Sequence, residues 1–270
     1  MSARETVINS PDNQFVRAAR AVRDGKQREL IFIEGKRLCA EAISAGLIIE
    51  EAFITEELAR NERHELLHRD LLRSGCRTYL VSERVLDSIA DTKTPQGIVL
   101  IARRPAAQAS ALEKAINNTT LLVILHRVGN PSNAGSVLRT AEAAGACGAI
   151  ITTGSVYIFS PKALRGAMGS SFRLPVWAGA EYAEALAWCR ARGIAIVATN
   201  ARASRSYSEF DWTNPSALVV GAEASGLTID EAAQADEAVS IPMRAPVESL
   251  NVGVAAAVVL YEAMRQRRGL

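Results

Sequence analysis

The stretch VSIPMRAPVESLNVGVAAAVVLYEAMR, residues 239–265, joins a short β-type run and two prolines to a long apolar segment. Pro242 ends the β-type run, because a proline cannot donate to a central strand ladder. We expect Ser249 to begin the final helix, since its hydroxyl is suited to capping a helix N-terminus. Beyond it the helix is apolar around most of its circumference, with small residues such as Gly253 that permit close packing. The segment therefore predicts a buried terminal helix with polar residues at its mouth: Glu248, Ser249 and Asn251.

The composition of the chain is that of a globular protein with ample material for a core. Of its 270 residues, 49% are hydrophobic and 22% are charged. The net charge of +2 does not by itself indicate a nucleic-acid-binding protein. A local run of basic residues at helical spacing could still contact phosphates, or could simply be a solvated face. It consists of Arg17, Arg20, Arg23, Lys26 and Arg28.

Several classes of protein are disfavoured by the sequence. The four cysteines are far apart and form no C-x-x-C pair, which argues against a zinc site or a disulfide framework and fits a reducing compartment. His64 and His68 lie one helical turn apart without a third ligand, so we expect a surface helix there and no metal. No signal-peptide segment follows Met1, and no apolar run approaches ~20 residues. We therefore expect a cytoplasmic protein that does not enter the membrane.

The first part of the chain, residues 1–105, is predicted to form a small α/β domain because apolar runs alternate with helical patterns. A linker is expected at residues 106–118. The predicted strands are 30–33, 48–54, 79–81 and 97–101, and the predicted helices are 37–45, 56–73 and a short one capped by Ser82.

The second part, residues 119–270, has the pattern of a parallel sheet. Continuous apolar runs at 120–125, 149–152, 194–199 and 217–221 are typical of strands buried on both faces. Helices are expected at 134–144, 161–168 and 181–192, and an extended segment at 172–177. The order of the strands does not follow from these patterns.

Polar residues and glycines follow several of these strands, where ligands of open α/β sheets bind. Singly, each could be a turn residue or a helix cap, but together they indicate a site. They include Asn130, Asn133, Arg139, Thr199, Asn200, Gly221, Glu223 and Gly226. A G-x-G-x-x-G fingerprint and a phosphate-binding P-loop are missing, which disfavours a metabolic nucleotide-binding enzyme. His126 directly follows a buried strand, and either a satisfied core histidine or a site residue fits that position.

Three segments in order resemble the motifs of the SpoU/TrmH family of the SPOUT superfamily, which are RNA ribose 2′-O-methyltransferases using S-adenosylmethionine. They are NPSNAGSVLRTAEAAG (130–145), LVVGAEASGL (218–227) and IPMRAPVESLNVGVAAAVVLYE (241–262). The segment FIEGKRLCAEAI (32–43) is similar to part of the small RNA-binding domain, related to ribosomal protein L30e, that precedes this catalytic domain in many members. The implied fold class is thus an L30e-like α/β domain followed by a parallel-sheet α/β domain with a C-terminal trefoil knot.

The resemblance also implies site residues. Matching positions for catalysis are Asn133, Arg139, Glu223, Ser249 and Asn251. Matching positions for S-adenosylmethionine are Thr199, Asn200, Val220, Gly221, Gly226, Ile241, Met243, Ser249 and Leu250. Arg139 is often given the role of base in this family, but a guanidinium releases its proton only at great cost, so anchoring a phosphate suits it better. Glu223 is expected to pair with an Asn or Arg side chain and fix it.

The sequence departs from the family pattern at His126 and Asn130, where members commonly have Asp. The function that the resemblance implies is 2′-O-methylation of RNA, with 23S ribosomal RNA preferred as the substrate. Transfer RNA is an alternative substrate, and a non-catalytic knotted RNA-binding relative is an alternative class. A homodimer built on the last helix is expected from its apolar positions Val254, Val258, Val259 and Tyr261.

Overall fold

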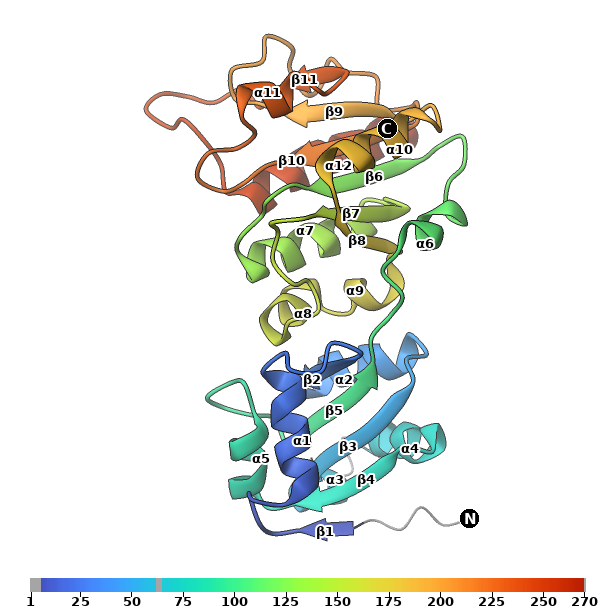
Figure 1. The fold of residues 1–270 in the computed structure, drawn as a ribbon, viewed down its shortest axis with the longest axis vertical. Coiled ribbons are helices and arrows are strands. Elements are labelled where there is room, and N and C mark those ends of the chain that lie inside the picture. Colours follow the sequence, from blue (N-terminus) through green and yellow to red (C-terminus); the bar gives the residue numbers. More distant parts are fainter. Residues whose placement is uncertain (1–5, 62–64, 270) are drawn as a thin grey trace. The chain divides into compact units, whose positions relative to one another are not determined.

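The computed structural model describes residues 6–61 and 65–269, which form two compact units (Figure 1). Unit 1 contains the chain up to Pro105 together with Phe159–Phe172. Unit 2 contains Ala106–Ile158 and the chain from Arg173 onward. The segment 159–172 thus packs with unit 1 although it lies within the stretch expected to form the second domain. His64 lies outside the described residues.

Unit 1 is built on a mixed sheet with the strand order β1-β4-β3-β5-β2. The strands are β1 (Thr6–Ile8), β2 (Leu30–Glu34), β3 (Ile49–Thr55), β4 (Arg77–Val81) and β5 (Ile98–Arg103). β1 and β3 run parallel to β4, whereas β5 runs antiparallel to both β3 and β2. Phe32, Phe53 and Tyr79 pack from this sheet into one core cluster with residues of the helices α1 and α5. The helices are α1 (Gln14–Arg23), α2 (Lys36–Ser44), α3 (Glu56–Arg60), α4 (Glu65–Ser74), α5 (Glu83–Ile89) and α8 (Pro161–Ala167).

Two predictions in this part of the chain are wrong. The single helix expected over 56–73 is two helices, because α3 ends at Arg60 and α4 begins at Glu65. The segment 172–177 is not extended throughout: Phe172 and Arg173 belong to the short helix α9 (Ser170–Arg173), and the strand starts at Val176.

Unit 2 is built on a six-stranded sheet with the order β11-β9-β10-β6-β7-β8, in which every pairing is parallel. This confirms the predicted parallel sheet. The strands are β6 (Leu121–Leu125), β7 (Gly148–Thr152), β8 (Val176–Ala180), β9 (Ala195–Thr199), β10 (Ser216–Val220) and β11 (Glu237–Val239). The helices are α6 (Ala109–Glu113), α7 (Pro131–Ala143), α10 (Tyr182–Arg190), α11 (Ile229–Ala232) and α12 (Val252–Arg267).

Helices cover both faces of this sheet, which explains why its central strands are apolar without alternation. Leu122 and Ile124 of β6 share a core cluster with Leu186 of α10. Successive side chains of a strand point to opposite faces, so Leu121, Val123 and Leu125 face the other side. α12 packs against α7 and β10. Because every pairing in the sheet is parallel, the carboxyl ends of its strands all lie at one edge.

Two of the helices that begin at this edge, α7 and α12, are capped by asparagines. Asn130 caps α7 by accepting from the backbone N–H of Ser132 at 2.9 Å, and Pro131 occupies the first helical turn. α7 therefore begins earlier than predicted, and Asn133 lies inside it. Asn251 caps α12 by accepting from the N–H of Gly253 at 2.9 Å. The prediction that Ser249 caps the last helix is wrong, because Ser249 lies before the cap, in the preceding segment.

Candidate active site

A cavity of about 610 Å³ lies at the carboxyl edge of the sheet in unit 2. It is formed by the start of α7, the loop after β10 and the segment that leads into α12. Four of the five residues matched to catalysis line it: Asn133, Glu223, Ser249 and Asn251. Gly129, Asn130, Pro131, Leu250 and Val252 complete the lining. The tertiary fold thus brings the three sequence motifs to one place.

Glu223 holds the loop before α7 through both of its carboxylate oxygens. Its Oε2 accepts from the backbone N–H of Gly129 at 3.0 Å, and its Oε1 accepts from the N–H of Asn130 at 2.9 Å. The same Oε1 accepts from Nδ2 of Asn133 at 3.1 Å. The expected pairing of Glu223 with an asparagine side chain is therefore present. It fixes the Asn133 amide so that its oxygen is free to accept.

That oxygen links the first motif to the third. Nδ2 of Asn251 donates to Oδ1 of Asn133 at 3.2 Å. Because Asn251 also caps α12 with its own Oδ1, its amide orientation is fixed at both ends. Glu223, Asn133 and Asn251 therefore form a continuous chain of hydrogen bonds along the cavity.

The ionisation of Glu223 follows from these bonds. Partial burial opposes its charged form, but the N–H groups of Gly129 and Asn130 and the amide of Asn133 favour it, so the pKa of Glu223 is lowered. The residue is a carboxylate at neutral pH. With its oxygens engaged and its pKa lowered, it is better suited to holding Asn133 than to taking up a proton.

Arg139 does not join this cluster. It lies on α7 two turns from the cavity, with an exposed side chain, and it is not among the residues that line the cavity. Six positions separate it from Asn133, which places the two side chains on different sides of the helix. Arg139 is therefore not part of the cavity wall.

The residues matched to cofactor binding lie after three neighbouring strands. Thr199 ends β9 and donates from its hydroxyl to the carbonyl of Val219 at 3.0 Å, and Asn200 follows it. Val220 ends β10 and is buried. The remaining matched positions follow β10 and β11: Gly221, Gly226, Ile241, Met243, Ser249 and Leu250. Since β11, β9 and β10 are adjacent in the sheet, these positions gather at one stretch of its carboxyl edge.

The loop after β10 is folded tightly on itself at Gly221. A Cβ at that position would lie 2.5 Å from the carbonyl carbon of Gly226, a distance that real side chains do not adopt. Gly226 itself has a φ of 63°, in the left-handed region that glycine tolerates best. The two glycines are therefore required by the turn that presents Glu223.

His126 is the centre of a second set of polar contacts, most of which were not predicted from the sequence. His126 is 5% exposed and contacts Thr152 through Nδ1 at 2.9 Å and Glu231 through Nε2 at 3.0 Å. It is thus a satisfied buried histidine and does not line the cavity. Its partner Glu231 could have been found from Thr-x-x-Glu at 228–231, the signature of a capping box, which the structure contains.

Within the residues that the structure describes, no three side chains of the metal-binding types cluster. Among the same residues, no helix is long and apolar enough to cross a membrane.

Comparisons with known proteins fit this architecture. Residues 120–261 match the SpoU rRNA Methylase family, and residues 32–108 match the substrate-binding domain of RNA 2′-O ribose methyltransferases. The chain is 31% identical over 232 residues to the 23S rRNA (uridine(2479)-2′-O)-methyltransferase of Streptomyces viridochromogenes, covering 82% of this chain and 80% of the relative. It is 29% identical over 259 residues to the 23S rRNA (guanosine(2553)-2′-O)-methyltransferase RlmP of Bacillus subtilis, covering 94% and 97% of the two chains.

A solved structure is also similar. The AdoMet-bound rRNA methyltransferase from Sinorhizobium meliloti superposes with a TM-score of 0.85 at 29% identity, covering 98% of each chain. Fold and site together define an RNA ribose methyltransferase with a substrate-binding domain. The chain belongs to the SpoU rRNA methylase family.

Proposed function

We propose that this protein transfers the methyl group of S-adenosylmethionine to a ribose 2′-oxygen of 23S ribosomal RNA. The observation that carries the proposal is the hydrogen-bonded chain of Glu223, Asn133 and Asn251 along a cavity at the carboxyl edge of a parallel sheet. The named relatives that match most of this chain act on 23S rRNA, one at a guanosine and one at a uridine. A protein acting on ribosomal RNA would work in the cytoplasm.

The loops after β9, β10 and β11 fit S-adenosylmethionine. Ile241 and Met243 are half-buried and Leu250 is 37% exposed, so apolar surface is available to pack on a purine. The backbone of Gly226 packs directly against Gly221, which fixes the path of the loop after β10. When bound, the cofactor supplies an electrophilic methyl group. No metal ion is part of this proposal.

The cavity residues are assigned to orientation of the ribose. The side-chain amides of Asn133 and Asn251 do not ionise at neutral pH, so they cannot act as acid or base, but they hold fixed donors and acceptors beside the cavity. The hydroxyl of Ser249 is exposed at the same cavity and can contact the ribose. Alignment of the 2′-oxygen with the methyl carbon is the main demand of such a displacement. Arg139, exposed on α7, is assigned to the phosphate next to the reacting nucleotide.

Unit 1 is proposed to bind the RNA. The basic run near the N-terminus supports this through its exposed members, whereas Arg20 and Arg23 have structural partners. Arg20 donates to the carbonyl of Pro11 at 2.9 Å, and Arg23 donates to carbonyls at the end of α5, including that of Ala90 at 3.0 Å. Arg17 and Lys26 are exposed, and we assign phosphate contacts to them.

We also propose a trefoil knot in unit 2. Residues 240–251 run from β11, at the edge of the sheet, to α12, which packs against β10 and α7. On the way, Ser240 donates from its N–H to the carbonyl of Arg205 and accepts from the N–H of Tyr207, both at 2.9 Å. These bonds tie the last segment to the connection between β9 and β10, as threading would require. An experimental structure in which residues 240–251 do not pass through the loop between β9 and β10 would refute the knot.

A homodimer through α12 is the proposed assembly. Val254 is 51% exposed and Tyr261 is 48% exposed, whereas Val259, which was expected on the same face, is fully buried. Two large exposed apolar residues on one helix are suited to a two-fold pair. Sedimentation should give about twice the monomer mass of 28.9 kDa, and a clean monomer at micromolar concentration would exclude this assembly.

The methyl-transfer proposal is tested by single-turnover transfer of labelled methyl from S-adenosylmethionine, with protein in excess over RNA. Purified 23S rRNA and bulk transfer RNA are offered separately, and the product is mapped for 2′-O-methylated nucleotides. Transfer to one position of 23S rRNA is expected. Transfer to transfer RNA alone would replace the substrate, and no binding of millimolar cofactor by calorimetry would refute the catalytic proposal.

A further inference from the structure

Side chains of the segment 221–231 form hydrogen bonds with both ends of the loop between β6 and α7. At the far end of the loop, Glu223 accepts from the N–H groups of Gly129 and Asn130. At the near end, Glu231 contacts His126 and Arg127. Two carboxylates from one short segment thus hold one loop, and only the first of them lines the cavity.

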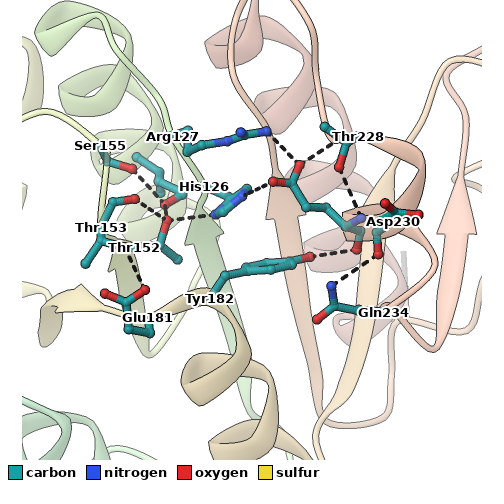
Figure 2. A network of polar contacts seen from close by, with 12 residues as sticks. His126, Arg127, Thr152, Thr153, Ser155, Glu181, Tyr182, Thr228, Asp230 and Gln234 are labelled. Carbon is teal, nitrogen blue, oxygen red and sulfur yellow. Dashed lines mark hydrogen bonds and ion pairs between the residues drawn. The ribbon is translucent and has the colours of Figure 1, made fainter.

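Glu231 uses both of its oxygens at the near end. Its Oε1 lies 3.0 Å from Nε2 of His126, and its Oε2 accepts from Nη2 of Arg127 at 2.7 Å and from the N–H of Thr228 at 2.8 Å. His126 and Arg127 reach this carboxylate from one segment of the chain and Thr228 reaches it from another; Figure 2 labels all three residues. We call these four residues, Glu231, His126, Arg127 and Thr228, the clamp.

The surroundings of the clamp make it rigid. The Tyr182 ring lies on the His126 ring at a centroid distance of 4.1 Å, and the Tyr182 hydroxyl donates to the carbonyl of Glu231 at 3.2 Å. On the other side of the imidazole, Oγ1 of Thr152 lies 2.9 Å from Nδ1 (Figure 2). The histidine side chain is only 6% exposed. His126 is therefore held in one orientation by three different elements.

The hydrogen bonds of the clamp also determine the ionisation of Glu231 and the position of the proton on His126. Burial opposes ionisation of Glu231, but the hydrogen bonds from His126 and Thr228 outweigh it and lower its pKa to about 2. A carboxylate can only accept, so Nε2 of His126 carries the proton that it donates to Glu231. Arg127 adds a second charge-assisted bond. The clamp is thus closed at neutral pH.

The backbone at the near end is strained, as expected for a loop that is held by its contacts. Arg127 has a φ of 55°, in the left-handed region that few residues other than glycine adopt. Its Nε is buried without a hydrogen-bond partner among the described residues. Both features cost free energy and persist only where the surroundings over-determine the conformation. The contact with Glu231 is the one charged contact of Arg127 found in the described structure.

We propose that Glu231 is a positioning residue for methyl transfer, which acts through the clamp to set the loop that carries Gly129 and Asn130 and thereby the Asn133 amide in the cavity. The proposal rests on the proposed methyl-transfer function. Glu231 itself does not line the cavity, so it acts on the reaction only through the loop. Asn130, the cap of α7, lies only four positions after His126, so a displaced clamp is transmitted directly to the start of that helix.

The direct test is amide hydrogen exchange of the stretch 126–133, which needs no activity. In Glu231→Ala the amides of Gly129 and Asn130 should exchange about tenfold faster or more, because the loop loses one of its two anchors. Asp230→Ala is the matched control, since it removes a neighbouring acidic side chain of α11 that takes no part in the clamp. Glu231→Gln, which keeps an oxygen for His126, should give an intermediate effect and serves if the alanine variant fails to fold.

The functional test is the single-turnover rate at saturating cofactor and RNA, measured well below the melting temperature. Glu231→Ala should lower the rate about tenfold in the wild-type background but hardly at all in a Glu223→Ala background, because both carboxylates act through the same loop. A merely stabilising role would give the same fold-change in both backgrounds. Unchanged exchange in Glu231→Ala, or faster exchange with an unchanged rate, would overturn the inference. A wild-type protein that transfers no methyl group would instead refute the proposed function, while the exchange result still decides whether the clamp holds the loop.

Discussion

Asn251 donates from Nδ2 to Oδ1 of Asn133 at 3.2 Å, although 118 positions separate the two residues in the sequence. The contact joins the N-terminal ends of α7 and α12, the two helices that pack together on one face of the sheet in unit 2. Glu223 binds the nitrogen of the same Asn133 amide. Hydrogen bonds therefore connect residues of all three sequence motifs. The cavity is therefore shaped by contacts that form only when the last helix has docked.

The two roles of Asn251 can be separated by substitution. Asn251→Ala removes the cap of α12 and the bond to Asn133, so it should cost about 1 kcal/mol of stability and slow methyl transfer. Asn251→Ser keeps a capping oxygen but cannot reach Asn133, so it should retain stability while the single-turnover rate falls about tenfold or more. Denaturant titration and labelled-methyl transfer measure the two effects. Equal rates for wild type and Asn251→Ser would remove this contact from the mechanism.

Arg139 should act on transfer without supporting the fold. Its side chain is exposed on α7, so Arg139→Ala should change the free energy of unfolding by no more than about 0.5 kcal/mol. If it orients the phosphate and ribose, single-turnover transfer should fall about a hundredfold while cofactor affinity is kept. Arg139→Lys should restore little of the rate, because an ammonium cannot reproduce a forked contact. A near-wild-type rate in the alanine variant would contradict the role assigned to this residue.

Arg267 is predicted to support the fold rather than to bind RNA. Its guanidinium donates to the carbonyls of Thr120 at 3.1 Å and Asn214 at 2.9 Å and to the hydroxyl of Ser216 at 3.3 Å. It also donates to the carbonyl of Thr119. Hydrogen bonds to a charged group contribute about 1.5–3 kcal/mol, and Arg267→Ala should destabilise the protein by about that amount. Urea denaturation measures it, with the exposed Arg268→Ala as a control expected to stay within about 0.5 kcal/mol.

The pH dependence of stability should contain a contribution from Glu231. Its pKa is lowered from 4.5 to about 2 in the folded protein, so folding favours its ionised form. This stabilisation is complete above about pH 4.5 and is lost as the pH falls through about 2. The stability difference between wild type and Glu231→Gln should accordingly be large at pH 6 and shrink towards pH 3. The same difference at both pH values would mean that the charge of Glu231 does not stabilise the fold, and Asp230→Asn provides the reference for charge removal alone.

RNA affinity should depend on the exposed members of the N-terminal basic run. The double substitution of Arg17 and Lys26 by alanine should weaken RNA binding and reduce the slope of log affinity against log salt by about one unit per lost phosphate contact. Cofactor affinity should not change. Arg60 and Arg73, whose side chains are 80% and 71% exposed on α3 and α4, are the matched control pair. Equal losses of RNA affinity for both pairs would indicate non-specific attraction and would refute the assignment of phosphate contacts to Arg17 and Lys26.

Local patterns in the sequence were sufficient for most strands of unit 2 and for the residues around its cavity. They missed α11 and also α6, which lies in the segment 106–118 that was expected to be a linker. The continuous apolar run of β6 is typical of a strand buried on both faces, and the parallel sheet places its polar strand-end loops at one edge. The resemblance to three family motifs was enough to predict the cavity residues, because each motif lies within one short segment of the sequence. These residues are Asn133, Glu223, Ser249 and Asn251. The predicted cap of the last helix was wrong, because Ser249 and Asn251 are both suitable cap residues and only the path of the preceding segment selects Asn251.

Tertiary structure alone decided which long-range contacts these residues make. The strand order places β11 beyond β9, at the edge of the sheet, and no local pattern contains that information. Phe159–Phe172 packs with unit 1, and because the other residues of that unit are distant in the sequence, no local pattern could predict this. Arg267, a basic residue near the chain end, donates to carbonyls of unit 2, and Val259, which was expected to contribute to a dimer surface, is fully buried; both follow from the docking of α12 on the sheet. Glu231 reaches His126 across 105 positions, since hydrogen bonds between distant segments depend on how the chain packs and not on which residues are neighbours in sequence.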